Sequence, residues 1–116
     1  MDNSKVIGED CGFDIVAYKL PEILPTDTFE EDYDDEEIKN FYSNRWRFVT
    51  VLVCAERLGV KLGATYMENV PDGYMSGDFG YEDAFDVVEL DELGRQSLEQ
   101  AQEIVMYMFT KGDTDV

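Results

Sequence analysis

The sequence predicts an α+β fold, in which a small antiparallel sheet of about three strands packs against a long C-terminal helix, with a short helix before the central hairpin. Three observations support this prediction. Residues 45–55 are rich in alternating β-branched and aromatic side chains, residues 60–67 alternate again after a turn, and residues 83–111 change to helical periodicity.

The beginning of the chain predicts one strand and one short helix. Residues 13–18 alternate well enough for a strand, and the prolines that follow should end it. Ile38, Phe41 and Tyr42 then have the spacing of a short helix that leads into the hairpin.

The middle of the chain predicts the central hairpin. Its first strand has two apolar faces, with Trp46, Phe48, Leu52 and Cys54 on one and Val49, Val51 and Val53 on the other. Two apolar faces are typical of a central strand that is covered on both sides. Residues 56–59 predict a turn and residues 60–67 the second strand. Residues 69–80, with one proline and three glycines, predict a loop that carries aromatic side chains.

The end of the chain predicts the long helix. An apolar stripe at helical spacing begins near Asp83, a candidate N-cap, and ends before Gly112. Its members are Val87, Leu90, Leu98, Ala101, Ile104, Val105 and Met108. Gly94 also lies on this stripe, where it can mark a kink, a break into two helices, or close packing against the sheet.

Length and composition favour one domain. The chain has 116 residues, of which 44% are hydrophobic and 13% aromatic, which is enough apolar surface for one core. We therefore expect a single acidic α+β domain over residues 1–116. No run approaches the roughly 20 apolar residues of a membrane span, and the first residues lack the pattern of a signal peptide. We expect a cytoplasmic protein that does not bind a membrane.

The charge of the chain is unusual and segregated. The sequence has 27 acidic and 9 basic residues and a net charge of −18. Residues 45–67 hold one acid and four bases, whereas the flanking blocks hold thirteen acids each. The hydrophobic and aromatic content indicates that a folded domain, and not a disordered tail, carries this charge. Such a surface repels nucleic acid and attracts basic proteins. We expect Arg45 and Arg47 to pair with the acidic segments.

Two sets of carboxylates are candidate binding residues. Residues 30–37 place seven carboxylates in eight positions, although acids at the start of a helix also complement its dipole. On the long helix, acids and Gln96 follow one another at spacings of three and four, roughly 200° from the apolar stripe and without basic residues four positions later. The candidate set is Glu30, Glu31, Asp32, Tyr33, Asp34, Asp35, Glu36, Glu37, Tyr74, Phe79, Glu89, Glu92, Glu99 and Glu103.

The residue types disfavour metal binding and catalysis. The chain has no histidine, and its two cysteines, Cys11 and Cys54, lack metal-ligand spacing and are better explained as reduced, buried thiols. Calcium loops that would begin at Asp32 and Asp72 each fail at a required position. No nucleophile elbow, P-loop or dinucleotide motif is present. We expect no enzyme activity, no catalytic residue, no metal and no cofactor.

A histidine-free chain with clustered carboxylates and interspersed aromatics resembles the acidic DNA-mimic inhibitors of phages and mobile elements, which include anti-restriction and anti-CRISPR proteins. The resemblance lies in the charge pattern of residues 27–37 and 68–103 and matches no family motif. It implies a non-enzymatic inhibitor, in the cytoplasm of a bacterial host cell, that occupies the basic nucleic-acid-binding surface of a host defence nuclease or effector complex and does not itself bind nucleic acid. Residues 30–37 would stand in for phosphates, with Tyr33, Tyr74 and Phe79 as anchors.

Two other functions stay open. One is a phage or plasmid accessory protein that binds a partner through an aromatic loop at residues 73–81 and is acidic for solubility only. The other is a metal-dependent enzyme that uses some of the carboxylates. The sequence leaves open the identity of the target, the oligomeric state, and whether the inhibitor would block binding or cleavage.

Overall fold

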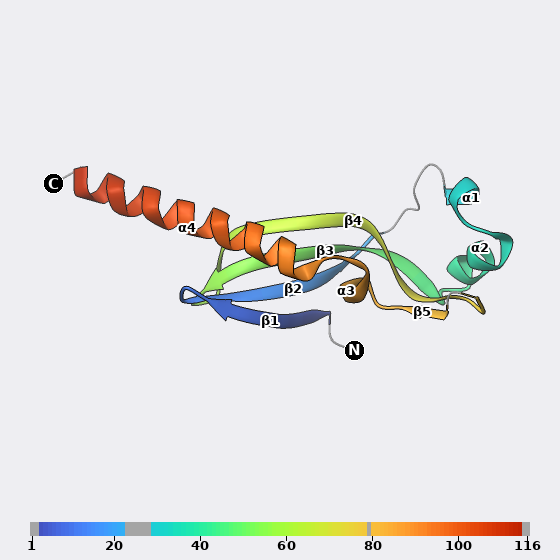
Figure 1. The fold of residues 1–116 in the computed structure, drawn as a ribbon. Helices are drawn as coiled ribbons and strands as arrows, with labels where there is room; N and C mark the ends of the chain where they lie inside the picture. Colours follow the sequence, from blue (N-terminus) through green and yellow to red (C-terminus); the bar gives the residue numbers. More distant parts are fainter. Residues whose placement is uncertain (1–2, 23–28, 79, 115–116) are drawn as a thin grey trace. The chain divides into compact units, whose positions relative to one another are not determined.

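The computed structural model describes residues 3–22, 29–78 and 80–114, without the side chains of residues 109–114. Its elements are β1 (Ser4–Asp10), β2 (Phe13–Pro21), α1 (Phe29–Asp32), α2 (Asp35–Tyr42), β3 (Trp46–Arg57), β4 (Val60–Ser76), β5 (Gly80–Glu82), α3 (Ala84–Val87) and α4 (Leu90–Thr114) (Figure 1). The chain divides into two compact units: unit 1 comprises Met1–Tyr18, Leu52–Tyr66 and Leu90–Val116, and unit 2 comprises Lys19–Val51 and Met67–Glu89.

The α+β class holds in broad outline, but the predicted sheet of about three strands is wrong. The sheet has five antiparallel strands in the order β1-β2-β3-β4-β5. β1 pairs with β2 from Ser4↔Tyr18 to Asp10↔Phe13. Six of the seven residues of β1 are exposed, so the strand lacks the alternation by which a sequence reveals a buried face. β5 has only three residues, too few for a readable period.

The loop predicted at residues 69–80 is wrong for most of its length, because β4 continues to Ser76. Gly73 explains why the sequence misleads here. Its φ is 126°, and a Cβ at this position would lie 2.5 Å from the carbonyl oxygen of Arg45 and 2.7 Å from the Cα of Trp46. This glycine therefore permits the close approach of two backbones within the sheet and does not mark the start of a loop.

The central hairpin is confirmed. β3 lies in the middle of the strand order, and both of its faces are buried, with Phe48, Val49, Val51, Val53 and Cys54 at most 2% exposed. The predicted turn at residues 56–59 is also present. Leu58 and Gly59 have φ values of 53° and 79°, typical of the tight turn that joins two antiparallel strands.

The single helix predicted from Asp83 is wrong, because Val88 has extended dihedral angles that separate α3 from α4. Asp83 does cap α3, since its Oδ1 accepts the Phe85 N–H at 3.0 Å. Of the alternatives for Gly94, close packing is the one found. α4 runs through this position, and a Cβ there would lie 3.1 Å from Cγ2 of Ile15. Within the described residues, no helix is long and apolar enough to cross a membrane.

In unit 1, α4 packs on the sheet through small residues. The Ser97 hydroxyl donates to the carbonyl oxygen of Val53 at 2.7 Å. A Cβ on Gly63 would lie only 1.9 Å from the carbonyl oxygen of Ser97. The backbones of α4 and β4 therefore approach so closely that large side chains do not fit between them.

The apolar stripe predicted for the long helix is only partly its buried face. Ala101 is fully buried, but Ile104 and Met108 are 42% and 63% exposed. The buried positions of α4 are Leu93, Gly94, Ser97 and Ala101. A face made largely of small residues carries a weak hydrophobic signal, which is why the stripe of larger side chains misplaces it.

Unit 2 is built on a cluster of aromatic side chains. Phe29, Trp46, Phe48 and Met75 are buried, and Tyr33, Ile38 and Phe41 pack against them. The indole N–H of Trp46 donates to the carbonyl oxygen of Glu37 at 2.8 Å, and Nδ2 of Asn40 donates to the carbonyl oxygen of Met75 at 2.8 Å. These two bonds attach α2 to β3 and β4. The short helix predicted before the hairpin is thereby confirmed.

Unit 2 also buries Lys19. Its Nζ lies 2.9 Å from Oδ1 of Asp72 and 2.9 Å from Oδ1 of Asp83. The same ammonium lies 4.7 Å from the ring centroid of Phe85, and Asp72 Oδ1 also accepts the Ala84 N–H at 3.0 Å. This network joins β2 to β4 and to the start of α3 and compensates the buried charge.

Candidate binding site

The acidic run at residues 30–37 folds as α1 and the beginning of α2. Asp34 is the N-cap of α2: its Oδ1 accepts the Glu37 N–H at 2.8 Å, and Oε1 of Glu37 accepts the Asp34 N–H at 3.0 Å. This reciprocal pair is a capping box. Oε1 of Glu36 accepts the Gly77 N–H at 3.1 Å. Acids of the run therefore hold its second half in one arrangement.

Most of the acidic run faces solvent. Its exposed carboxylates are Glu30, Glu31, Asp32, Asp34, Asp35 and Glu36. Within the described residues, Lys and Arg form no ion pair with Glu30, Glu31, Asp34, Asp35, Glu36 or Glu37. Arg47 forms an ion pair with the second acidic block, as expected, since its Nε lies 3.9 Å from Oδ2 of Asp72.

A pocket of about 730 Å³ lies beside this run in unit 2. It is lined by the acids Glu31, Asp32, Asp34, Glu37 and Glu82 and by Tyr33, Pro71, Met75 and Val87. Five of these residues belong to the predicted candidate set. Glu82, Pro71, Met75 and Val87 were missed as pocket residues, because the sequence gives no sign that the end of β4, β5 and α3 come to lie beside the acidic run. Acidic and apolar groups thus share one concave surface.

Glu37 differs from the other acids of the run, because it is only 5% exposed. Its spacing from Asp34 is the signature of a capping box and is the signal that could have identified this role from the sequence. Glu37 therefore belongs to the wall of the pocket and to the framework of α2, and a surface that mimics phosphates would use its neighbours.

Tyr33 is half-buried and is part of the core of unit 2. Its ring centroid lies 5.1 Å from that of Trp46 and 5.8 Å from that of Phe48. Burial raises the pKa of the Tyr33 phenol, and the charges of Asp32 and Glu37 raise it further. The hydroxyl therefore stays protonated across the neutral range and can donate a hydrogen bond at the pocket.

Tyr74, the other predicted aromatic residue that the structure describes, does not line this pocket. Tyr74 lies on β4, is 37% exposed, and donates its N–H to the carbonyl oxygen of Arg45 at 2.9 Å. Phe79 lies outside the described residues. Glu89 is exposed, but it precedes α4 and belongs to unit 2, so it is not part of a stripe on that helix.

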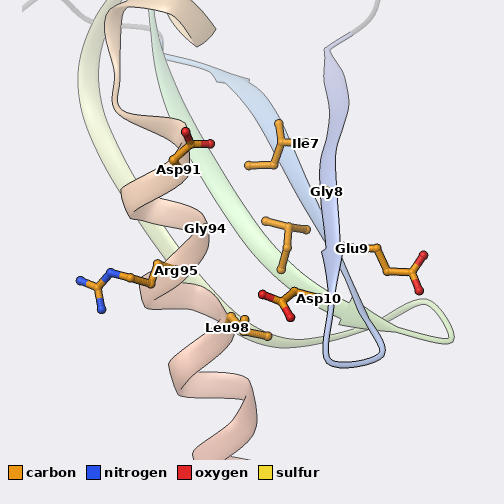
Figure 2. Close-up of a pocket in the computed structure, with 9 residues that line it drawn as sticks. Ile7, Gly8, Glu9, Asp10, Asp91, Gly94, Arg95 and Leu98 are labelled. Atoms are coloured by element: carbon orange, nitrogen blue, oxygen red, sulfur yellow. The ribbon is translucent and has the colours of Figure 1, made fainter.

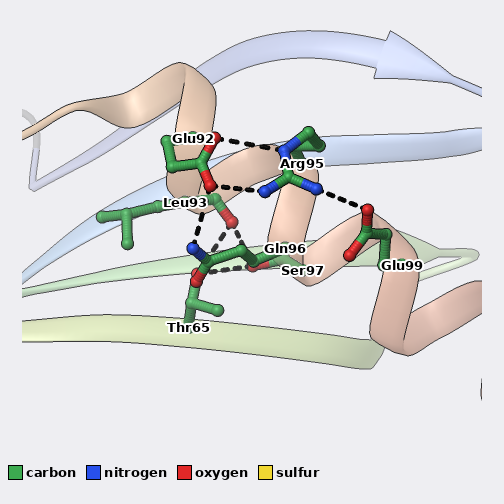
Figure 3. A network of polar contacts seen from close by, with 7 residues as sticks. All are labelled: Thr65, Glu92, Leu93, Arg95, Gln96, Ser97 and Glu99. Carbon is green, nitrogen blue, oxygen red and sulfur yellow. Dashed lines mark hydrogen bonds and ion pairs between the residues drawn. The ribbon is translucent and has the colours of Figure 1, made fainter.

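The acidic stripe of α4 lies in unit 1 and is partly neutralised, which corrects the expectation that it lacks basic partners. Figure 3 shows the Arg95 guanidinium between Glu92 and Glu99, and ion pairs join it to both. Hydrogen bonds from Arg95 and Gln96 lower the pKa of Glu92. Arg95 was overlooked because the sequence was searched for bases four positions after each acid, whereas Arg95 follows Glu92 by three positions and precedes Glu99 by four. Glu103 is exposed further along the helix.

Unit 1 has a smaller pocket of about 260 Å³ between β1 and α4. Figure 2 shows Ile7 and Asp10 of β1 directed toward α4. The charged end of Glu9 points away from α4, and the charged end of Arg95 points away from β1. Gly94 and Leu98 form the helical side of the pocket. The lining is mostly apolar, although the Asp10 carboxylate is directed toward the helix. This pocket therefore offers few groups that could orient a polar ligand.

The thiols and acids of the described residues offer no metal centre. No group of three or more Cys, Asp or Glu in this part of the chain is arranged to hold a metal ion. Both cysteines are free. Cys54 is buried as expected, but Cys11 is exposed in the turn between β1 and β2, which corrects the expectation of two buried thiols.

A comparison of the chain with protein-family models, with curated proteins and with solved structures finds no match. The function must therefore be argued from the residues and geometry of this chain alone.

Proposed function

We propose that this protein is a non-enzymatic acidic inhibitor, which binds the basic nucleic-acid-binding surface of a bacterial defence or DNA-processing protein and excludes the nucleic acid. The observation that carries the proposal is the acidic run of unit 2. Six of its carboxylates are exposed on α1, on the N-cap and on the first turn of α2. An ordered acidic surface attracts basic partners over long range and disfavours acidic ones.

The fixed geometry of the run supports binding as well as attraction. The capping box and the bond from Gly77 to Glu36 order part of this surface before any partner arrives. A preordered surface loses less conformational entropy on binding than a flexible acidic tail does. The acids of α4 contribute less on this proposal, because Arg95 neutralises part of the charge of Glu92 and Glu99.

The matched test uses two double charge reversals. E30K/D35K changes two exposed acids of the run that line neither pocket, and E9K/D14K changes two exposed acids of the β1–β2 hairpin. Both variants raise the net charge by the same amount. Asp34 is left intact in both, because reversing it would also remove the cap of α2.

Proteins that the wild-type chain captures from a bacterial lysate are identified and purified. Their binding to the wild type, to E30K/D35K and to E9K/D14K is then measured. We expect the captured protein to bind nucleic acid. Duplex DNA should displace it from the wild-type chain, and its affinity for that chain should fall steeply as the salt concentration rises. We expect E30K/D35K to weaken binding about tenfold or more, and E9K/D14K to weaken it less than about threefold. Equal losses for both variants, or no competition by DNA, would contradict the proposal. Binding that is insensitive to salt would instead favour an apolar accessory protein.

A further inference from the structure

The pocket of unit 2 is lined by a buried carboxylate that, among the described residues, is only partly hydrogen-bonded. Glu37 lines the pocket and is 5% exposed. Its Oε1 accepts the Asp34 N–H at 3.0 Å. Within the described residues, no donor contacts its Oε2 and no lysine or arginine forms an ion pair with it.

A buried carboxylate without a cation is unfavourable, and a cationic group that enters the pocket would relieve this cost. The rim increases the attraction, because Glu31, Asp32, Asp34 and Glu82 also line the pocket. Negative groups around a concave surface concentrate cations there. The electrostatics of the pocket therefore select a positively charged ligand.

The apolar walls restrict which cation fits. Tyr33, Pro71, Met75 and Val87 offer an aromatic ring and aliphatic surface beside the acids. A guanidinium is planar, is weakly hydrated, makes paired hydrogen bonds to a carboxylate and stacks on aromatic rings. A divalent metal ion would need several converging oxygens, and the acids of the described residues are not arranged for one.

We propose that this pocket receives an arginine side chain of the partner protein, with the guanidinium on Glu37 and the aliphatic arm against Met75 and Val87. The volume of about 730 Å³ leaves room for the residues that flank the arginine. This inference rests on the proposed function, because nucleic-acid-binding surfaces present arginine to phosphates. The exposed acids would steer the partner, and the pocket would hold it.

The test uses the full chain and a blocked pentapeptide, Gly-Gly-Arg-Gly-Gly, with peptides that carry lysine or norleucine in place of arginine. Titration calorimetry measures affinity, and methyl resonances of Met75 and Val87 report occupancy of the pocket. We expect saturable binding of the arginine peptide, binding of the lysine peptide about threefold weaker, and none of the norleucine peptide. The resonances of Met75 and Val87 should shift together with the calorimetric signal.

Two neutralising variants separate the pocket from general attraction. E37Q removes the buried charge but keeps the capping box, because glutamine also serves at this position. E30Q removes an exposed charge of the same run that does not line the pocket. E37Q should weaken binding of the arginine peptide about tenfold, and E30Q less than twofold. Thermal unfolding of both variants verifies that each is folded.

Equal losses in E37Q and E30Q, or binding of the norleucine peptide as tight as that of the arginine peptide, would overturn the arginine site. These results do not depend on identifying the partner. If arginine binds as expected but the captured protein does not compete with DNA, the pocket stands and the proposed function fails. If E30K/D35K weakens binding of the captured protein as expected but E37Q binds the arginine peptide as the wild type does, the function stands and the pocket fails.

Discussion

Asp34 and Glu37 each accept the backbone N–H of the other, at 2.8 Å and 3.0 Å, so that two acids of the run close the first turn of α2. The pair satisfies two backbone donors that the start of a helix otherwise leaves open. The seven carboxylates of the run therefore divide by role. Asp34, Glu36 and Glu37 accept backbone N–H groups that hold the run in place. Glu30, Glu31 and Asp35 are exposed.

Replacement of Asp34 should destabilise the protein through the loss of this cap. We expect Asp34→Ala to lower the free energy of unfolding by about 1 kcal/mol, measured by urea denaturation. The matched control is Asp35→Ala, which removes an exposed neighbouring acid and should change stability by less than about 0.5 kcal/mol. Equal effects of the two replacements would show that the cap has no special weight.

The close approach of α4 to β4 predicts that Gly63 tolerates no side chain. A Cβ there would lie 1.9 Å from the Ser97 carbonyl oxygen, so Gly63→Ala must displace the helix. We expect a loss of about 3 kcal/mol in thermal or urea unfolding. Gly8→Ala is the control, because no atom lies within 4 Å of its Cβ position, and it should be close to neutral. A stable Gly63→Ala variant would refute this packing.

The ion pairs of Lys19 predict how stability changes at alkaline pH. Burial lowers the pKa of Lys19, but the hydrogen bonds and charges of Asp83 and Asp72 outweigh it and hold the pKa above the usual 10.5. Because the pKa of Lys19 is higher in the folded than in the unfolded chain, its ion pairs stabilise the protein fully below the unfolded pKa of 10.5. This contribution is lost as the pH rises from 10.5 through the folded-state pKa. Stability should therefore fall in the alkaline range above pH 10.5.

Asp83→Asn tests that expectation, because asparagine still caps α3 but leaves Lys19 with one fewer carboxylate. The alkaline loss of stability, followed by chemical denaturation at a series of pH values, should be smaller and should be complete at lower pH in this variant. An unchanged alkaline profile would mean that Asp83 does not stabilise the lysine.

The two thiols should differ sharply in reactivity. Cys11 is exposed and Cys54 is buried, so a thiol-specific chromogenic reagent should modify one thiol in the folded protein and two after unfolding. The hydrogen bond and charge of Asp10 raise the pKa of Cys11, which slows its reaction at neutral pH. Asp10→Asn should therefore accelerate the modification. Two fast thiols in the folded chain would contradict the burial of Cys54.

The sequence was most informative where apolar side chains recur at the period of a buried strand or helix, or where a residue fixes a turn. β3, its hairpin turn and α2 were predicted because Val49, Val51 and Val53 are buried, Gly59 adopts positive φ, and Phe41 packs in the core. β1 was missed because an exposed edge strand has no such pattern. The contact face of α4 was misplaced because the closeness of Gly63 to the helix is a property of the fold, which no local period records.

The candidate site was predicted in part for similar reasons. The acidic run is visible in the sequence, and so is the spacing that pairs Asp34 with Glu37. The sequence does not reveal that this run lines one pocket with Met75 and Val87, which lie at least 38 positions further along the chain than Glu37. Long-range packing brings these residues together, so charge alone could suggest a surface but not a pocket.

Trp46 is the chain's one tryptophan, is 2% exposed, and belongs to the aromatic cluster of unit 2. Its emission is therefore an intrinsic optical reporter of that unit, whereas α4, the longest helix, contributes its circular dichroism from unit 1. The strands β2, β3 and β4 each supply residues to both units. Denaturation followed by both signals would thus count the cooperative blocks in this chain: coincident transitions mean one block, and separated transitions mean two.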